Sequence, residues 1–417
     1  MNEPQPNNRF FTTPLIIIFV TVFIDLVGFG MVIPLLPFYA DTPPFSATPF
    51  QIGLMVSIYS WMQFFFAPVL GRLSDRYGRR PILFISILGS AVGYFVIGFA
   101  ETLTLVFVGR IIGGITGGNI STAQAYIADV TTRENRAKGM GLFGAAFGLG
   151  FIIGPALTGI LSKYGIHVPF YFAAGLSLLN AIALYLILPE SLTPGQMNAP
   201  AEKRSRVAAF LASLENAEFR VINLIYFLLV TAFSIMTYAY VLYTARRFGY
   251  TAEQNGYIFV FVGVIAVVAQ GILFGPLARR LGEPLLVTAG CLLMSGTLIA
   301  IPFIGPTVGG LTALLIVTAL LALGNSLASP SLTSLASKTA DEHEQGRTLG
   351  VLQSGASLAR AIGPSIGGIL LNNTADQIDP STILRTFGTA AAIMLIAFFA
   401  TFLLGKVNWR GNNTQIN

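Results

Sequence analysis

Long apolar runs separated by short polar loops organise almost the whole chain. Twelve runs of about 20 residues can be marked. They lie near 14–38, 50–70, 81–100, 103–127, 139–162, 168–188, 221–245, 254–276, 284–303, 311–336, 348–371 and 386–405. A run of this length spans a bilayer as a helix, because in lipid every backbone polar group must be bonded within its own segment. The stretch from Pro284 to Ser337 has no charge, and the turn-forming cluster IPFIGPTVGG divides it into two helices.

The polar segment from Pro189 to Glu218 divides the runs into two sets of six. Sequence echoes support this division: GRLSDRYG at 71–78 returns as GPLARRLG at 275–282, and IIGPALTGIL at 152–161 returns as AIGPSIGGIL at 361–370. Internal repeats of this kind are typical of secondary transporters. The sequence therefore predicts an all-α integral membrane protein of twelve transmembrane helices in two pseudo-symmetric six-helix halves, 1–188 and 219–417, joined by a cytoplasmic linker at 189–218.

The linker ends in a short amphipathic stretch. Its apolar positions are Val207, Phe210, Leu211 and Leu214. We interpret it as a strap on the inner membrane surface in preference to a regulatory site.

Composition agrees with a membrane protein and excludes several other classes. Charged residues make up 10% of the chain and hydrophobic residues 54%, whereas about a quarter of the residues of soluble proteins are charged. Neither histidine, His167 or His343, has a second histidine or a cysteine at ligand spacing, and Cys291 is the single cysteine. The sequence has no Walker phosphate loop and no serine nucleophile elbow. We therefore expect no metal, no cofactor and no enzymatic activity.

The positive charges predict the orientation of the helices. If the N-terminus is cytoplasmic, only Lys163, Arg246, Arg247 and Arg385 lie in loops on the opposite side, and most of the 24 Lys and Arg residues are cytoplasmic. The net charge of +6 is then a topology signal facing anionic lipid, and no nucleic-acid partner is expected. Both termini are expected to be cytoplasmic in a multi-pass protein of the cell membrane, and the short loops suit a bacterial inner membrane.

Three ionisable residues fall well inside predicted helices: Asp25, Arg110 and Arg360. Such groups are costly in a bilayer and each is a functional hypothesis. Asp25 is the only carboxyl near mid-membrane. Burial and a nearby arginine act in opposite directions on the proton affinity of a carboxyl, and their balance suits proton exchange near neutral pH. The alternative is a permanent pair of Asp25 with Arg110 or Arg360 that only braces the helix bundle.

Four stretches together resemble the major facilitator superfamily. GRLSDRYGRR at 71–80 resembles its loop motif between helices two and three, and FVGRIIGGITGG at 107–118 resembles its arginine motif on helix four. GLGFIIGPALTG at 148–159 resembles the helix-five motif of its antiporter branch. FIDLVGFGMVIPLLPFYA at 23–40 resembles helix one of the drug:proton antiporters, particularly the tetracycline-efflux group.

The resemblance implies roles for the motif residues. Asp25 and Arg110 would couple transport to protons, and Asp75, Arg79 and Asp129 would form a cytoplasmic charge cluster that latches the halves. The whole cytoplasmic gate would consist of Gly71, Asp75, Arg76, Gly78, Arg79, Arg80 and Asp129. On helix five, Gly150, Gly154 and Pro155 would kink the helix and limit leak, although close helix packing is a sufficient reason for Gly144, Gly148, Gly150, Gly154 and Gly159.

Aromatic and polar residues of several helices are candidates to line a substrate cavity. They are Phe29, Tyr59, Gln63, Asn119, Gln124, Tyr238, Gln353 and Arg360. Packing or a place in the interfacial aromatic belt is the alternative for each of them.

The expected function is proton-coupled efflux of amphiphilic small molecules by a monomeric carrier that works by alternating access. Two alternatives remain: a proton symporter or uniporter for a small anionic metabolite, with Arg110 and Arg360 as ligands, and a non-transporting receptor. Tetracycline exporters carry acidic and histidine residues on helices eight and nine, whereas here residues 255–278 of helix eight are uncharged and helix nine has only Glu283, at its cytoplasmic edge. The resemblance thus supports proton coupling more than any particular drug.

Overall fold

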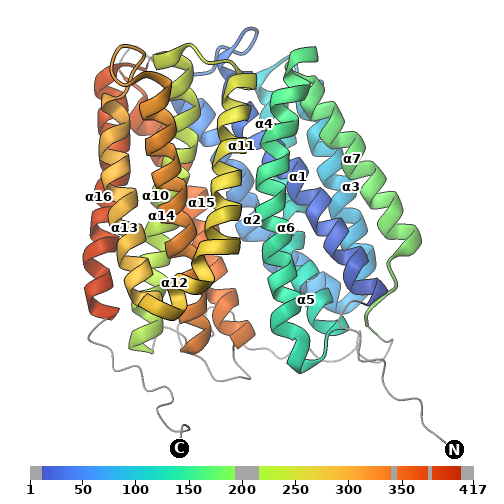
Figure 1. Ribbon diagram of the computed structural model, residues 1–417. Helices are drawn as coiled ribbons and strands as arrows, with labels where there is room; N and C mark the ends of the chain where they lie inside the picture. The colour runs from blue at the N-terminus through green and yellow to red at the C-terminus, as the bar shows by residue number, and fades with distance from the viewer. Residues whose placement is uncertain (1–11, 193–215, 340–344, 374–377, 405–417) are drawn as a thin grey trace, which may run out of the picture. The chain divides into compact units, whose positions relative to one another are not determined.

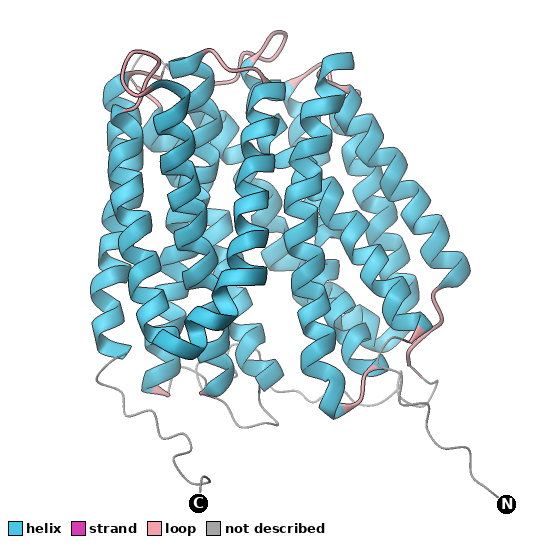
Figure 2. Cartoon of the chain, in the orientation of Figure 1, coloured by secondary structure: helices cyan, strands magenta, loops and turns pink. Residues whose placement is uncertain are grey.

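The computed structural model describes residues 12–192, 216–339, 345–373 and 378–404. These residues form helices joined by short loops (Figures 1 and 2), and no strand occurs among them beyond isolated bridges at Gly305. Ten helical segments in the described ranges are long and apolar enough to cross a membrane. The predicted fifth and eleventh runs correspond to two more long helices, α6 and α15. The prediction of an all-helical membrane protein is confirmed.

Over the described residues, each predicted run lies in one helix or in consecutive helical segments, with at most two residues beyond a helix end. In the first half these are α1 (Thr13–Asp41), α2 (Pro49–Tyr77), α3 (Arg79–Gly98), α4 (Leu103–Thr116), α5 (Ile120–Val130), α6 (Arg133–Leu161) and α7 (Val168–Ile187). In the second they are α10 (Ala217–Phe248), α11 (Ala252–Val268), α12 (Phe274–Leu281), α13 (Glu283–Ala300), α14 (Gly310–Lys338), α15 (Gln345–Leu371) and α16 (Pro380–Leu404). The amphipathic stretch around Phe210 lies outside the described residues.

Local sequence explains where several helices begin and end. Thr48 and Gln51 form a reciprocal capping box at the start of α2, with Pro49 at its first position. Gly78 joins α2 to α3 with a φ of 100°, and Gly282 joins α12 to α13 with a φ of 79°. Both angles favour glycine. The echoed motifs at 71–78 and 275–282 therefore end in the same kind of turn.

A second pair of equivalent residues supports the internal repeat. The Tyr39 hydroxyl donates to the Ile97 carbonyl at 2.8 Å, and the Tyr243 hydroxyl donates to the Ile301 carbonyl at 2.9 Å. In each case a tyrosine near the end of the first helix of a half fixes the end of the third. A buried phenol needs a hydrogen-bond partner. In both halves that partner is a backbone carbonyl at the end of the third helix.

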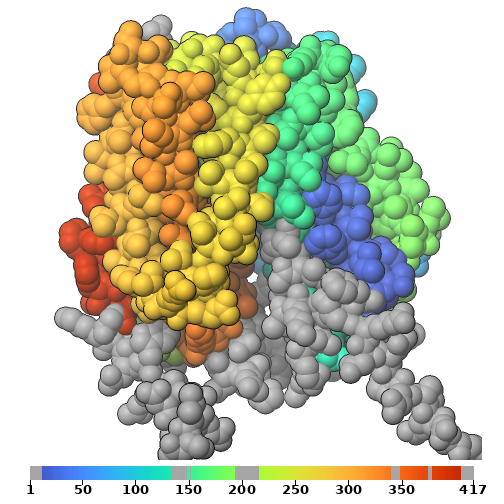
Figure 3. All heavy atoms as spheres, viewed as in Figure 1, coloured from blue at the N-terminus to red at the C-terminus, as the bar shows by residue number. Residues whose placement is uncertain are grey.

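Contacts between residues divide the chain into two compact units. Unit 1 contains residues 1–202 and 244–263, and unit 2 contains residues 203–243 and 264–417. In unit 1 the end of α6 packs against the start of α11, and the two helices lie side by side on the face shown in Figure 3. Their backbones approach closely at Gly159 and Gly256. An ion pair between Lys163 and Glu253, with 2.9 Å between Nζ and Oε1, lies beside this contact.

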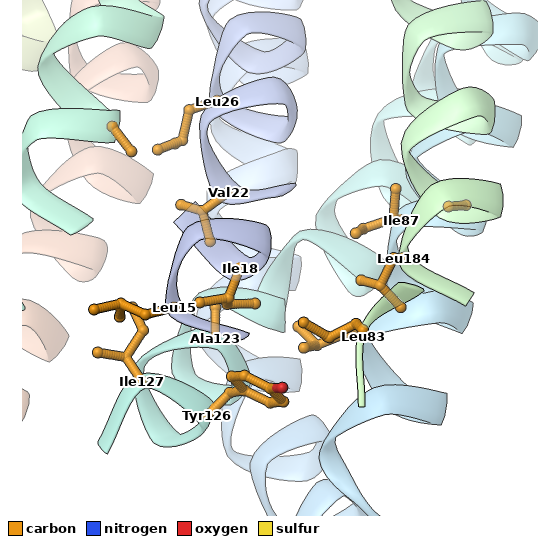
Figure 4. Close-up of a cluster of buried hydrophobic side chains, with 13 residues drawn as sticks. Leu15, Ile18, Val22, Leu26, Leu83, Ile87, Ala123, Tyr126, Ile127 and Leu184 are labelled. Atoms are coloured by element: carbon orange, nitrogen blue, oxygen red, sulfur yellow. The ribbon is translucent and has the colours of Figure 1, made fainter. Parts of the chain in front are cut away.

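The core of unit 1 contains a cluster of buried apolar side chains from α1, α3, α5, α6 and α7 (Figure 4). Its members are Leu15, Ile18, Val22, Leu26, Leu83, Ile87, Ala123, Tyr126, Ile127, Ala146, Ala181, Leu184 and Leu188. At one end of the cluster the Tyr126 hydroxyl donates to the Pro189 carbonyl at 2.9 Å. Asp25 lies next to Leu26, which is the last residue that α1 contributes to the cluster and lies at the end away from Tyr126.

Candidate functional site

Asp25 meets Asn119 in the middle of unit 1. The Asn119 amide donates from Nδ2 to Oδ2 of Asp25 at 3.2 Å. Asp25 is partly exposed, whereas Asn119 is 5% exposed. Within unit 1 the carboxyl of Asp25 forms no ion pair with a described residue. The sequence predicted both residues as site candidates but did not predict that they touch.

A break in the fourth predicted helix places Asn119. The α-helical pattern is interrupted by the 3-10 turn η1 (Gly117–Asn119) between α4 and α5. Glycines allow this segment to lie directly on α2: a Cβ at Gly114 would lie 2.5 Å from the Tyr59 carbonyl oxygen, and one at Gly118 would lie 2.8 Å from the Ala67 nitrogen. Interrupted membrane helices commonly form ion and substrate sites because backbone groups become available there.

Gln63 bonds one of the backbone groups at the break. Its Nε2 donates to the Gly117 carbonyl at 2.7 Å. Gln63 is 8% exposed, so its amide is largely occupied in holding α2 to η1. Gln124, one turn further along α5, is partly exposed.

Arg110 is held by α2, and no acidic side chain among the described residues pairs with it. Its Nε donates to the Met55 carbonyl at 3.2 Å and its Nη2 to the Val56 carbonyl at 3.4 Å. The guanidinium carbon lies 4.4 Å from the centre of the Tyr59 ring, and Arg110 is only 4% exposed. The structure therefore does not contain the Asp25–Arg110 pair that was one alternative for the role of these residues.

Aromatic rings pack on α1 within about one turn after Asp25. The Phe29 and Tyr59 rings have centroids 5.3 Å apart. Tyr94 of α3, which was not among the predicted candidates, is 6% exposed and packs against α1 at Gly28. A Cβ at Gly28 would lie 3.2 Å from the Tyr94 ring. Gly28 was the one sequence feature that could have pointed to this contact, since a glycine about one turn after Asp25 leaves space for a ring from another helix.

The helix-five motif packs against α1 next to Asp25. A Cβ at Gly150 would lie 2.7 Å from Cβ of Leu26, and one at Gly154 would lie 2.7 Å from the backbone of Gly30. The Thr158 hydroxyl also donates to the Met31 carbonyl at 2.7 Å. These contacts account for the two glycines by close helix approach. Pro155 lies inside α6, and its carbonyl faces α11 near Gly256.

The predicted gate residues Asp75, Arg79 and Asp129 lie together at one end of unit 1. Arg79 donates from Nε to Oδ2 of Asp129 at 3.1 Å and from Nη1 to Oδ1 of Asp75. The same Nη1 donates to the Ser74 hydroxyl at 2.7 Å. The arginine is 8% exposed, so its charge is matched by two carboxylates in a largely desolvated position.

Glu190 also belongs to this cluster, although it falls in the segment predicted to be the linker. Its Oε1 accepts from the Arg79 backbone N–H at 2.9 Å and its Oε2 accepts from the Arg80 N–H at 3.0 Å. The carboxylate thus caps the first turn of α3, whose N-terminus carries a partial positive charge. Ser191 donates to Asp129 at 2.9 Å. No local pattern links residues 190 and 191 to a helix that begins at residue 79, so only the tertiary structure could reveal this contact.

The remaining gate candidates have separate partners. Arg80 donates to the Tyr185 carbonyl and stacks over the Tyr185 ring at 5.1 Å. Arg76 lies over the exposed ring of Tyr77. Gly71 accepts from the Ser74 hydroxyl at 2.7 Å through its carbonyl.

Three substrate-cavity candidates belong to unit 2. Tyr238 is 3% exposed and packs against Gly367, where an added Cβ would lie 2.7 Å from the ring. Gln353 is exposed, and Arg360 donates to the Ser357 hydroxyl at 3.1 Å. Over the described ranges, no group of three or more His, Cys, Asp or Glu side chains is arranged to hold a metal ion.

Comparison with known proteins gives the family. The Major Facilitator Superfamily model matches residues 18–364 and 307–415. Tetracycline resistance protein, class C, of Escherichia coli is 33% identical over 84% of this chain and 88% of its own length. Multidrug resistance protein 2 of Bacillus subtilis is 31% identical over 86% of this chain and 89% of its own.

Solved structures agree on the fold. The human organic anion transporter MFSD10 (TETRAN) is 25% identical and matches with a TM-score of 0.70 over 95% of this chain and all of its own. The peptide transporter POT in complex with sulfate matches with a TM-score of 0.76 at 16% identity, covering 97% of this chain and 96% of its own. The motifs, the helical membrane fold and these matches together show that the chain is a multi-pass membrane protein of the Major Facilitator Superfamily.

Proposed function

We propose that this protein is a proton-coupled exporter of amphiphilic small molecules, with Asp25 as the proton-exchanging group. The observation that carries this proposal is the state of Asp25, which lies within a membrane helix and bonds a neutral amide. A carboxyl with a cationic partner would be held in its charged form, whereas a carboxyl beside an amide can take up and release a proton. The similarity to drug-resistance proteins supports export.

The placement of Arg110 favours this function over uptake of an anionic metabolite. The guanidinium is occupied by two carbonyls of α2 and by the Tyr59 ring. A substrate anion would have to compete with these contacts for a cation that is almost completely buried. In unit 1 the accessible charge at the site is therefore the carboxyl of Asp25.

The charge cluster at Arg79 supports a switch by alternating access. It consists of charge-assisted hydrogen bonds that are strong when formed and that exchange for water when the cluster opens. We place this cluster on the cytoplasmic side, with both termini, in a bacterial inner membrane. The partners are then protons, a small-molecule substrate and the surrounding lipid, and the carrier works as a monomer.

Proton release from purified protein on ligand addition tests the proposal. A panel of lipophilic drugs and organic anions is added to weakly buffered protein in detergent, and the native chain is compared with Asp25→Asn. We expect at least one lipophilic compound to release protons from the native chain and none from Asp25→Asn. Glu101→Gln is the matched control, because Glu101 is an exposed carboxyl outside the site.

Two outcomes would overturn the proposal. Binding without proton release from the native chain would indicate a facilitator with a structural Asp25. Proton release that is triggered only by organic anions and is lost in an Arg110 variant would favour the anion carrier.

A further inference from the structure

A small cavity lies next to Asp25 inside unit 1. Its volume is about 10 Å³, and a site of this size holds one water molecule. The lining residues are Thr21, Val22, Asp25, Leu26, Leu83, Ile87, Asn119, Ile120 and Ala123. We propose that this cavity is a binding site for a single internal water that hydrogen-bonds the Asp25 carboxyl and serves as its proton partner. This inference rests on the proposed role of Asp25.

The hydrogen bonding of Asp25 requires a further partner. An ionised carboxylate offers about four acceptor positions. The described residues fill one of them, through the 3.2 Å bond from Asn119, which is long for an N–H···O⁻ contact. A polar atom that lacks a protein partner and faces an internal cavity is normally bonded to ordered water. The cavity lies where such a molecule would reach the carboxyl.

The polar lining suits water better than it suits a metal cation. Three of the lining residues carry polar side chains: Thr21, Asp25 and Asn119. Internal water commonly makes about three hydrogen bonds, whereas a hard cation takes six or more oxygen ligands. Thr21 is rigidly placed, since its carbonyl accepts from Nδ2 of Asn180 on α7 at 3.0 Å.

The remaining walls close the cavity toward the Arg79 end of unit 1. Val22, Leu83, Ile87 and Ala123 belong to the buried apolar cluster of Figure 4, which continues past Ile18 to Tyr126. Apolar packing of this kind contains no chain of hydrogen bonds along which a proton could move. The water can therefore exchange a proton with Asp25 but cannot pass it on toward the Arg79 end of unit 1.

The site is tested by infrared difference spectroscopy between high and low pH. An internal water gives a sharp O–H stretching band that moves to lower frequency in water enriched with oxygen-18. We expect such a band in the native protein when Asp25 changes protonation, and no band in Asp25→Asn. Thr21→Val keeps the side-chain shape but removes a hydrogen-bonding hydroxyl, and Ala123→Val fills the cavity. Both substitutions should abolish the band.

Matched controls distinguish loss of the bound water from general effects of losing a hydroxyl or adding methyl groups. Thr122→Val removes a buried hydroxyl on α5 that has no hydrogen-bond partner among the described residues. Ala181→Val adds the same two methyl groups to the same apolar cluster without lining the cavity. Both controls should keep the band. Its loss in the controls, or its persistence in both Thr21→Val and Ala123→Val, would overturn the inference.

The two proposals fail in different ways. Ligand-induced proton release without a water band in the native protein would leave the exporter standing and overturn the water site. A water band without ligand-induced proton release would support the water site and overturn proton-coupled export.

Discussion

The guanidinium of Arg110 lies 4.4 Å from the centre of the Tyr59 ring and does not form an ion pair with Asp25. Cation–π contact and two carbonyl acceptors together replace the solvation that the arginine loses in the protein interior. Arg110 therefore joins α4 to α2 and is not the cationic partner of the Asp25 carboxyl.

Arg110→Lys should destabilise the protein although it keeps the charge. A lysine amine cannot reproduce the planar fork that bonds two carbonyls and stacks on a ring. We expect a loss of about 2 kcal/mol in the free energy of unfolding, measured by detergent-induced denaturation. Arg72→Lys is the control, because Arg72 is exposed and donates to the Pro68 carbonyl on the same helix at 3.3 Å. Equal effects of the two substitutions would contradict the role of Arg110.

Gly154→Ala should disrupt the contact between α6 and α1. The new Cβ would lie 2.7 Å from backbone atoms of Val27, Gly30 and Met31, and backbone cannot move aside as a flexible side chain can. We expect a loss of about 1–3 kcal/mol in the free energy of unfolding and a large loss of transport in membrane vesicles. Gly148→Ala on the same helix meets no atom within 4 Å and should leave both unchanged. Normal transport by Gly154→Ala would show that the close approach is dispensable.

Glu190→Ala should weaken the gate cluster although Glu190 lies outside the 71–80 motif. The substitution removes the acceptors of the Arg79 and Arg80 backbone N–H groups, so we expect a loss of about 1 kcal/mol in the free energy of unfolding. Transport should fall because Arg79 then loses its fixed position. Glu190→Gln keeps one acceptor oxygen and should recover part of both losses. The capping role fails if Glu190→Gln is as impaired as Glu190→Ala.

The stability of unit 2 should depend on the protonation of Asp379 in the loop before α16. Hydrogen bonds from Ser381, Asn373 and the Thr382 backbone hold the pKa of Asp379 well below its usual range. A lowered pKa in the folded state stabilises the protein above the usual pKa, about 3.9, and this contribution is lost as the pH falls below that value. The melting-temperature difference between the native chain and Asp379→Asn should be constant above about pH 5 and shrink below about pH 4. A difference that does not change with pH would contradict this assignment.

Much of the fold follows directly from the sequence. Over the described residues, every predicted span is helical apart from one or two residues at its end. The reason is that in lipid the backbone must satisfy its own hydrogen bonds, and a long apolar run leaves few other conformations. The turns at Gly78 and Gly282 were also visible as echoed motifs, since a positive φ favours glycine wherever the chain needs that turn. The contact of Asp75, Arg79 and Asp129 was expected only because the motif resembles a known family.

Other features were decided by tertiary structure alone. Hydropathy does not show that the fourth span breaks at Gly117, because the break arises where glycines meet α2. It also does not show which acceptors Arg110 uses, or that Glu190 caps a helix more than a hundred residues earlier in the chain. The hydropathy along the chain specifies which segments enter the membrane and which few charges enter with them. Only the packing of helices decided the partners of those charges, because a desolvated charge bonds whatever polar groups the neighbouring backbone brings within reach.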